Sequence, residues 1–115
     1  MKKMLLVALA LIGGVFFWGY AHMEAYCFFY PVIDTEFAAG FSEQAFSQVS
    51  TGMTAEVVQQ KLGAPLYSFT NGNGTVCWGY TGDGKCKWGD WAWMCRQVYL
   101  RDGRVEEITK EWRYD

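Results

Sequence analysis

The chain lacks most of the residues on which catalytic and metal sites depend. Of its 115 residues only one is a histidine, His22, and only two are prolines. A single histidine excludes most His-based catalysis, and no motif supports Ser-Lys or paired-carboxylate chemistry. No two of the four cysteines have the C-x-x-C spacing of a zinc site. We therefore expect no enzyme, no cofactor and no metal.

Basic side chains are also scarce beyond the N-terminus. Lys2 and Lys3 aside, 8 of the 10 basic residues remain against 12 acidic ones. Binding to nucleic acid depends on a basic surface that neutralises phosphates. We therefore expect no nucleic-acid partner.

Charge is missing altogether from residues 4–21, an apolar run that follows Lys2 and Lys3. A short basic segment before an apolar one is typical of an export signal. The run is long enough to span a bilayer, and Phe16–Trp18 crowd its outer end as an interfacial belt does. We expect an uncleaved membrane anchor with the lysines in the cytoplasm. The alternative is a signal peptide cleaved near Ala21.

A short helix at residues 54–62 has signals at both ends. Thr54 is placed to cap its first turn, and Met53 is placed to pack on the helix as a hydrophobic staple. Gly63 supplies a left-handed residue, and Pro65 prevents the helix from resuming. A similar cap at Ser42 predicts an earlier helix near residues 42–50.

After Pro65 the pattern changes to strands. Residues 66–69 and 75–81 flank the turn Asn71–Gly74, and a loop then runs to about Asp90. Further strands are expected over residues 91–101 and from 104 to about 112, joined by Asp102–Gly103. The prediction is an α+β domain of two short helices on an antiparallel meander of three to four strands, preceded by the hydrophobic helix. We divide the chain into a signal-anchor or signal peptide (1–21), an apolar linker (22–40) and the domain (41–115).

Two of these stretches also carry a family resemblance. Gly52-Met53-Thr54, with Val57 in the first turn and Leu62-Gly63-Ala64-Pro65 at the end, resembles the signature of the SmpA/OmlA (BamE-like) domain family. The stretch 98–108, with its turn at Gly103, resembles the last hairpin of that family. The resemblance covers roughly residues 41–110. It implies the same two-helix, antiparallel-sheet fold, which also resembles each half of the β-lactamase inhibitory proteins. The fold-signature positions are Gly52, Met53, Thr54, Val57, Leu62, Gly63, Pro65 and Gly103.

The resemblance implies a non-enzymatic interaction module of the bacterial envelope, with an outer-membrane assembly role and an envelope protein complex as partner. The family usually carries a lipid-modified cysteine, but bulky Tyr26 directly before Cys27 departs from that pattern. We therefore expect the domain in the periplasm, held at the inner membrane through residues 4–21, or free in the periplasm if residues 1–21 are removed. The alternatives are an enzyme inhibitor and a module that binds cell-wall sugar or lipid.

The cysteines suggest a disulfide, because exported chains commonly oxidise an even number of thiols. In the predicted strands Cys77 and Cys95 point away from the helices and lie symmetrically about the intervening loop. Strand pairing would then bring them opposite each other, so we expect a Cys77–Cys95 bond. The main alternative pairs Cys86 with one of them.

The most unusual segment, which we call the Trp-rich segment, runs from Lys85 to Trp93 and holds three tryptophans and two lysines. One interpretation is that the tryptophans complete a small core. The other is a contact surface, because tryptophan is enriched at protein interfaces and at membrane interfaces. The candidate contact residues are Lys85, Lys87, Trp88, Trp91 and Trp93.

Overall fold

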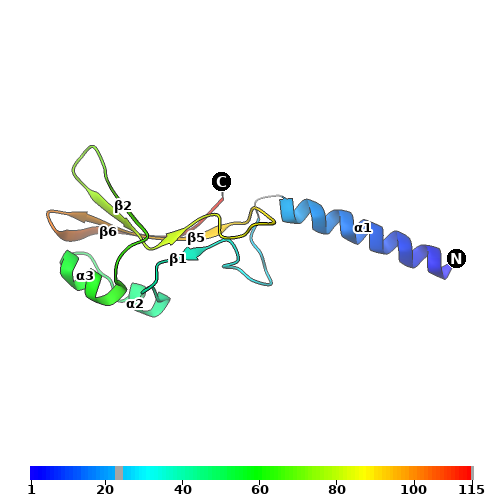
Figure 1. The fold of residues 1–115 in the computed structure, drawn as a ribbon, viewed down its shortest axis with the longest axis horizontal. Helices are drawn as coiled ribbons and strands as arrows, with labels where there is room; N and C mark the ends of the chain where they lie inside the picture. The colour runs from blue at the N-terminus through cyan, green and yellow to red at the C-terminus, as the bar shows by residue number, and fades with distance from the viewer. Residues whose placement is uncertain (23–24, 115) are drawn as a thin grey trace.

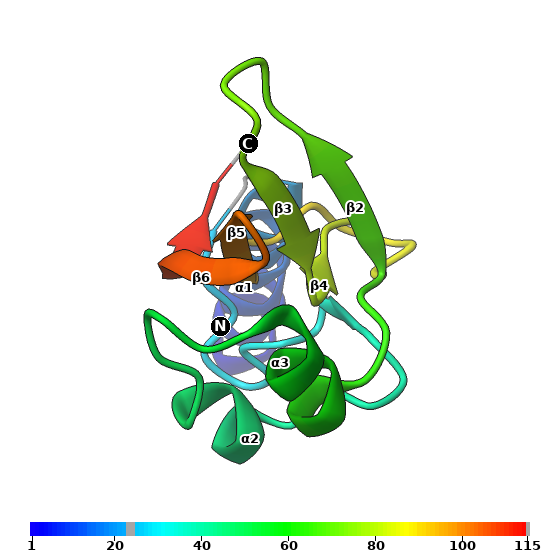
Figure 2. The ribbon, with the colours of Figure 1, turned by 90° about the vertical axis from the view of Figure 1, so that its left-hand side faces the viewer.

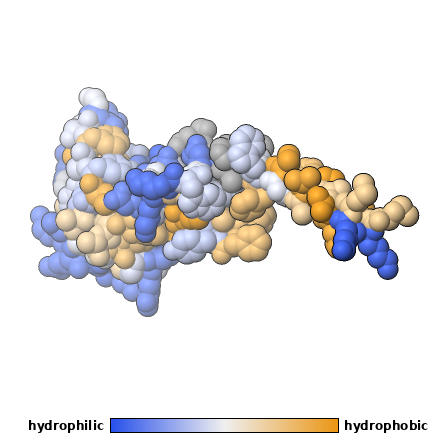
Figure 3. Space-filling model, turned by 45° about the vertical axis from the view of Figure 1, so that its right-hand side comes forward, coloured by the Kyte–Doolittle hydropathy of each residue, from blue (hydrophilic) through white to orange (hydrophobic). Residues whose placement is uncertain are grey.

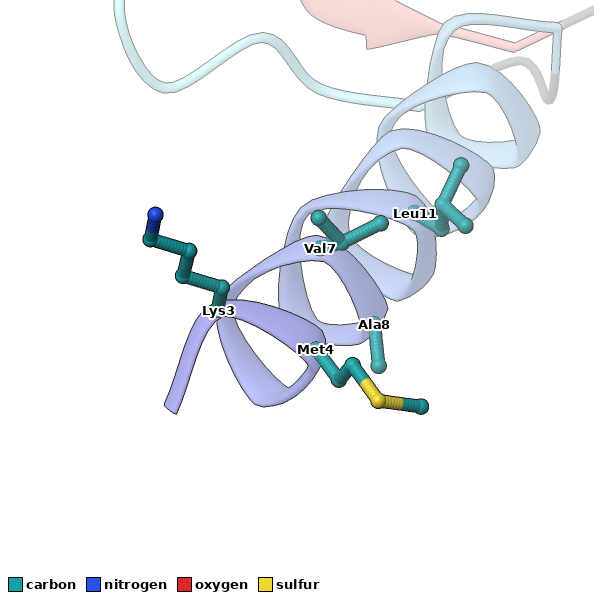
Figure 4. Close-up of a pocket in the computed structure, with 5 residues that line it drawn as sticks. All are labelled: Lys3, Met4, Val7, Ala8 and Leu11. Carbon is teal, nitrogen blue, oxygen red and sulfur yellow. The ribbon is translucent and has the colours of Figure 1, made fainter. Parts of the chain in front are cut away.

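The apolar helix α1 (Lys2–His22) extends away from the rest of the molecule (Figure 1). The computed structural model describes residues 1–22 and 25–114. The segment Lys2–Tyr20 is long and apolar enough to cross a membrane, and no residue of it is fully buried in the fold. Figure 3 shows hydrophobic residues along α1, and Figure 4 shows side chains such as Met4, Ala8 and Leu11 projecting outward from it. A membrane anchor and a signal sequence share these features.

Two short helices, α2 (Glu43–Ser47) and α3 (Ala55–Leu62), begin where the sequence predicts. Ser42 and Thr54 each accept a backbone N–H from three residues ahead, at 3.1 and 3.3 Å. Gly63 has a φ of 74° and ends α3. Helix α2 is shorter than the predicted 42–50, because the N–H of Gln48 bonds back to the Ala45 and Phe46 carbonyls and tightens the last turn.

The main sheet contains four antiparallel strands in the order β2-β3-β5-β6. They are β2 (Tyr67–Thr70), β3 (Val76–Gly79), β5 (Trp93–Arg101) and β6 (Arg104–Arg113). A separate two-stranded sheet pairs β1 (Glu36–Phe37) with β4 (Thr81–Gly82). The predicted α+β class is thus confirmed.

The single strand predicted over residues 75–81 is instead divided at Tyr80 between the two sheets. The N–H of Tyr80 donates to the Arg96 carbonyl at 3.0 Å, and its own carbonyl accepts from Ala38 at 2.9 Å. The chain therefore leaves the main sheet at Tyr80 and takes up β1 as its partner. The cause is the 25–40 segment, which the sequence pattern did not identify as part of a sheet.

One hydrophobic cluster joins the short helices to the main sheet. Its fully buried members include Val58 and Leu62 from α3, Val98 from β5, and Tyr80. Figure 2 shows α2 and α3 on the same side of the sheet. The opposite face of the sheet carries no helix among the residues that the structure describes.

Residues 52–55, at the start of α3, lie against residues 103–105 of the last hairpin. The N–H of Gly52 donates to the Val105 carbonyl at 2.8 Å, and the N–H of Val105 returns to the Met53 carbonyl at 2.8 Å. The N–H of Ala55 donates to Gly103 at 2.9 Å. The start of α3 is therefore bonded to the last hairpin, which lies 48 to 53 residues further along the chain.

The predicted linker covers residues 22–40, of which 23–24 lie outside the described residues, and residues 25–40 are part of the domain. The segment contains β1 and the buried residues Cys27, Asp34, Thr35 and Ala38. A parallel bridge joins Ala25 to the Trp-rich segment. This apolar stretch therefore packs on the domain.

Candidate functional site

The face of the main sheet opposite α2 and α3 is the first candidate surface. Because side chains alternate along a strand, one set of polar and aromatic residues shares this face. We define the aromatic sheet face as Tyr67, Phe69, Gln97, Tyr99 and Arg113. Phe69 is exposed, while Tyr67, Tyr99 and Arg113 are half-buried.

Gln97 is the centre of a hydrogen-bond network on this face. Its amide nitrogen donates to the Tyr67 hydroxyl at 2.7 Å, and its amide oxygen accepts from the Tyr99 hydroxyl at 3.0 Å. The Arg113 guanidinium donates to the same oxygen at 3.4 Å. Gln97 is only 4% exposed, so water competes little for these bonds.

Other contacts fix the edges of the aromatic sheet face. The Tyr67 and Phe69 rings are stacked with centroids 6.3 Å apart, and Arg113 lies 5.8 Å from the centroid of the buried Trp93 ring. A 2.8 Å bond to Glu111 raises the pKa of Arg113, and burial raises the pKa of Tyr67. The tyrosines and the arginine are thus held in place by their own sheet.

Gly79 is required beneath the Tyr67 ring. A Cβ at this position would lie 1.9 Å from the ring carbon Cζ. Any side chain larger than hydrogen would push the ring off the sheet and away from Gln97. Neither residue was singled out by the sequence analysis, because the need for glycine arises only from cross-strand pairing.

All four cysteines are free thiols. Cys77 pairs with Tyr99 and Cys95 pairs with Glu111, so the expectation that strand pairing sets the two sulfurs opposite each other is wrong. Four residues of β5 separate the two positions, roughly 13 Å along the strand and too far for a bond. Both are fully buried, and burial raises the pKa of each thiol.

The Trp-rich segment is divided between core and surface. Trp91 is 1% exposed and Trp93 is also buried, so in the folded chain these two side chains follow the first interpretation and belong to the core. Both complete the packing at this end of the domain. Trp88 remains 54% exposed, and Lys85 and Lys87 are exposed beside it.

Asp34 holds this segment in place and was missed by the sequence analysis. Its buried carboxylate accepts the backbone N–H of Cys86 at 2.8 Å and of Trp91 at 3.2 Å. The hydroxyl of the neighbouring Thr35 accepts the Met94 N–H at 2.9 Å. These bonds take the place of strand partners that the loop does not have. No local motif in the sequence indicates them, because the two N–H groups lie 52 and 57 residues away from Asp34.

The carboxylates of Asp34, Asp83 and Asp90 approach within 4.8 Å of one another. Such oxygens are the ligands that Ca²⁺ prefers, but that ion takes six to eight of them. Asp34 already accepts two N–H groups, and the other two residues are exposed. The cluster by itself does not define a metal site.

An apolar pocket of about 250 Å³ lies where α1 meets the domain. We call it the junction pocket. Its wall is wholly apolar, and three segments contribute to it: α1, the 25–40 segment and the Trp-rich segment. The lining residues are Phe17, Tyr20, Cys27, Phe29, Tyr30, Ile33, Trp88 and Trp91.

Contacts between α1 and the domain close one side of the junction pocket. The Tyr20 ring meets the Trp91 ring edge-on with centroids 4.9 Å apart, and the Tyr20 hydroxyl donates to the Tyr26 carbonyl. Trp88 packs on Trp91 in the same manner at 5.6 Å. The predicted contact residue Trp88 therefore lies beside the end of the apolar helix.

No family model, curated protein or solved structure matches this chain.

Proposed function

We propose that this chain is a membrane-anchored, non-enzymatic interaction module that binds one envelope protein on its aromatic sheet face. Helix α1 holds the domain at the outer surface of the inner membrane, and the sheet projects away from it. The proposal follows the resemblance to the SmpA/OmlA family in its class of function.

The observation that carries the proposal is the Gln97 network on an uncovered face. Tyrosine, tryptophan and arginine are the residue types that dominate binding energy at protein interfaces. Here their positions are set by bonds of 2.7–3.4 Å before a partner arrives. Ordering them on binding therefore costs little entropy.

Photo-crosslinking in membranes tests this proposal. A benzophenone amino acid replaces Phe69 on the aromatic sheet face or, as the matched control, exposed Gln59 on α3. We expect a discrete protein adduct from position 69 and none from position 59. Phe69→Ala should lower capture of that protein about tenfold, while Gln59→Ala leaves it unchanged.

Mass spectrometry of the adduct separates the candidate functions. Subunits of an envelope assembly support the scaffold function. A soluble hydrolase supports the alternative, an inhibitor that uses this face as the β-lactamase inhibitory proteins do. Equal labelling at both positions overturns the proposal. The absence of any protein adduct also overturns it and favours the sugar- or lipid-binding alternative.

A further inference from the structure

We propose that the junction pocket binds the end of one acyl chain from a membrane phospholipid. The inference rests on the anchoring role of α1 proposed above, and it adds a ligand site that the aromatic sheet face does not involve. It follows from the chemistry of the pocket wall, its place along α1 and the exposure of its rim.

The wall of the junction pocket is apolar and therefore matches a hydrocarbon ligand. No polar atom of the lining residues contributes surface to the pocket. A cavity of this kind stays dry and takes apolar ligands, because water inside it would lose its hydrogen bonds. At about 250 Å³ it is below the usual range for a drug-sized ligand and has room for one chain end rather than a headgroup.

The position of the pocket places it beside the bilayer. The span Lys2–Tyr20 has 19 residues, which at 1.5 Å per residue is roughly 28 Å, close to the thickness of the hydrocarbon core. Phe17 and Tyr20 stand at the outer end of that span and also line the pocket. One wall is therefore continuous with the surface that lipid tails cover.

The rim is exposed in the way expected of residues in the membrane interface. Phe29, which lines the pocket, is 95% exposed although it is large and apolar, and Phe28 next to it in the sequence is 79% exposed. Tyr30 and Trp88 are exposed as well, and tyrosine and tryptophan are the residues that favour the headgroup level. In water this end of the domain would display a patch of aromatic side chains. In the membrane interface the same residues are covered.

A photoactivatable lipid provides the test. The full-length chain is reconstituted in phosphatidylcholine vesicles that contain phosphatidylcholine with a diazirine near the end of one acyl chain. After illumination, peptide mass spectrometry locates the adducts. We expect adducts within residues 27–33 and at Trp88, in addition to those along α1.

Two neighbouring phenylalanines give a matched pair of variants. Phe29 lines the pocket and Phe28 does not, yet both are exposed and neither is in the core. Phe29→Ala should lower the adducts within residues 27–33 and at Trp88 about tenfold, whereas Phe28→Ala should leave them unchanged. Ile33→Trp, which fills the pocket, should abolish them, provided that its circular dichroism matches the unaltered chain.

The outcomes separate this inference from the function on which it rests. Adducts along α1 without any in the pocket overturn the acyl-chain site and leave the anchor intact. The absence of adducts from α1 as well, with the chain recovered outside the vesicles, overturns both. Equal losses in the Phe28→Ala and Phe29→Ala variants also overturn the site, because they indicate general contact with the interface.

Discussion

The Asp34 carboxylate accepts the backbone N–H of Trp91 at 3.2 Å, across 57 residues of sequence. The same carboxylate accepts the Cys86 N–H at 2.8 Å. A single side chain from the predicted linker thus fixes both the loop and the tryptophan that packs on α1. The geometry of the junction pocket depends on this contact.

Replacement of Asp34 tests that dependence. Asp34→Ala leaves two N–H groups without an acceptor, and we expect the free energy of unfolding to fall by about 2–4 kcal/mol. Asp34→Asn retains one acceptor oxygen and should cost less. Urea unfolding of the full chain in detergent micelles, followed by tryptophan fluorescence, provides the measurement. Glu36→Ala, an exposed neighbour, should stay within about 0.5 kcal/mol and serves as the control.

Gly79→Ala should disrupt the aromatic sheet face. The new Cβ would lie 1.9 Å from the Tyr67 ring, so the ring must move and lose its 2.7 Å bond to Gln97. We expect a loss of about 1–3 kcal/mol in thermal or urea unfolding. Gly72→Ala, where no atom lies within 4 Å of the added Cβ, is the matched control.

A double variant identifies the cause of the Gly79→Ala effect. In a Tyr67→Ala background the ring is absent, so Gly79→Ala should cost much less than it does alone. An equal cost in both backgrounds would show that the main chain, rather than the Tyr67 ring, requires glycine at this position.

The stability of the domain should decrease between pH 10 and pH 12. Burial raises the pKa of Tyr80 to about 12, whereas an unfolded tyrosine loses its proton near 10. Above pH 10 the unfolded chain therefore binds fewer protons than the folded chain, and stability falls as the pH rises. Tyr80→Phe should reduce that slope by up to about 1.4 kcal/mol per pH unit.

Denaturation midpoints at pH 9, 10, 11 and 12 give the measurement for Tyr80. The cysteine and other tyrosine side chains with raised pKa values are present in both proteins, so the difference in slope isolates Tyr80. Tyr80→Phe also removes the 3.1 Å bond to the Gly63 carbonyl and should lower the stability at every pH. Parallel pH profiles in the two proteins would contradict the assignment to Tyr80.

Alkylation with iodoacetamide at pH 8 tests the state of the cysteines. Cys86 is partly exposed, while Cys77 and Cys95 are fully buried with raised pKa values. Since the thiolate is the reactive form, we expect Cys86 to react first and the buried pair to react on the order of 100-fold more slowly. After denaturation without reductant all four should react. A pair that reacts only after reduction would demonstrate a disulfide and contradict the free thiols.

Local signals in the sequence determined much of the fold. The caps at Ser42 and Thr54, the stop at Gly63 and the turn at Gly103 each depend on neighbours within about four residues. The helix α1 was also predictable, because an apolar run of 18 residues can be recognised from the sequence without knowledge of the tertiary structure. The expectation that Cys77 points away from the helices was also correct, because side chains alternate along β3 and its neighbours Val76 and Trp78 pack on the helix side.

Tertiary structure alone decided register, burial and the role of the segment before the domain. The register of the strands places Tyr99 opposite Cys77 and Tyr67 opposite Gly79, and it brings together the side chains of the Gln97 network. The sequence of one strand does not specify which residues of another strand pair with it. Burial assigned Trp91 to the core and left Trp88 on the surface, although both stand in one aromatic stretch. The physical reason is that caps and turns are local, whereas a sheet face and a pocket are assembled from segments far apart in the chain.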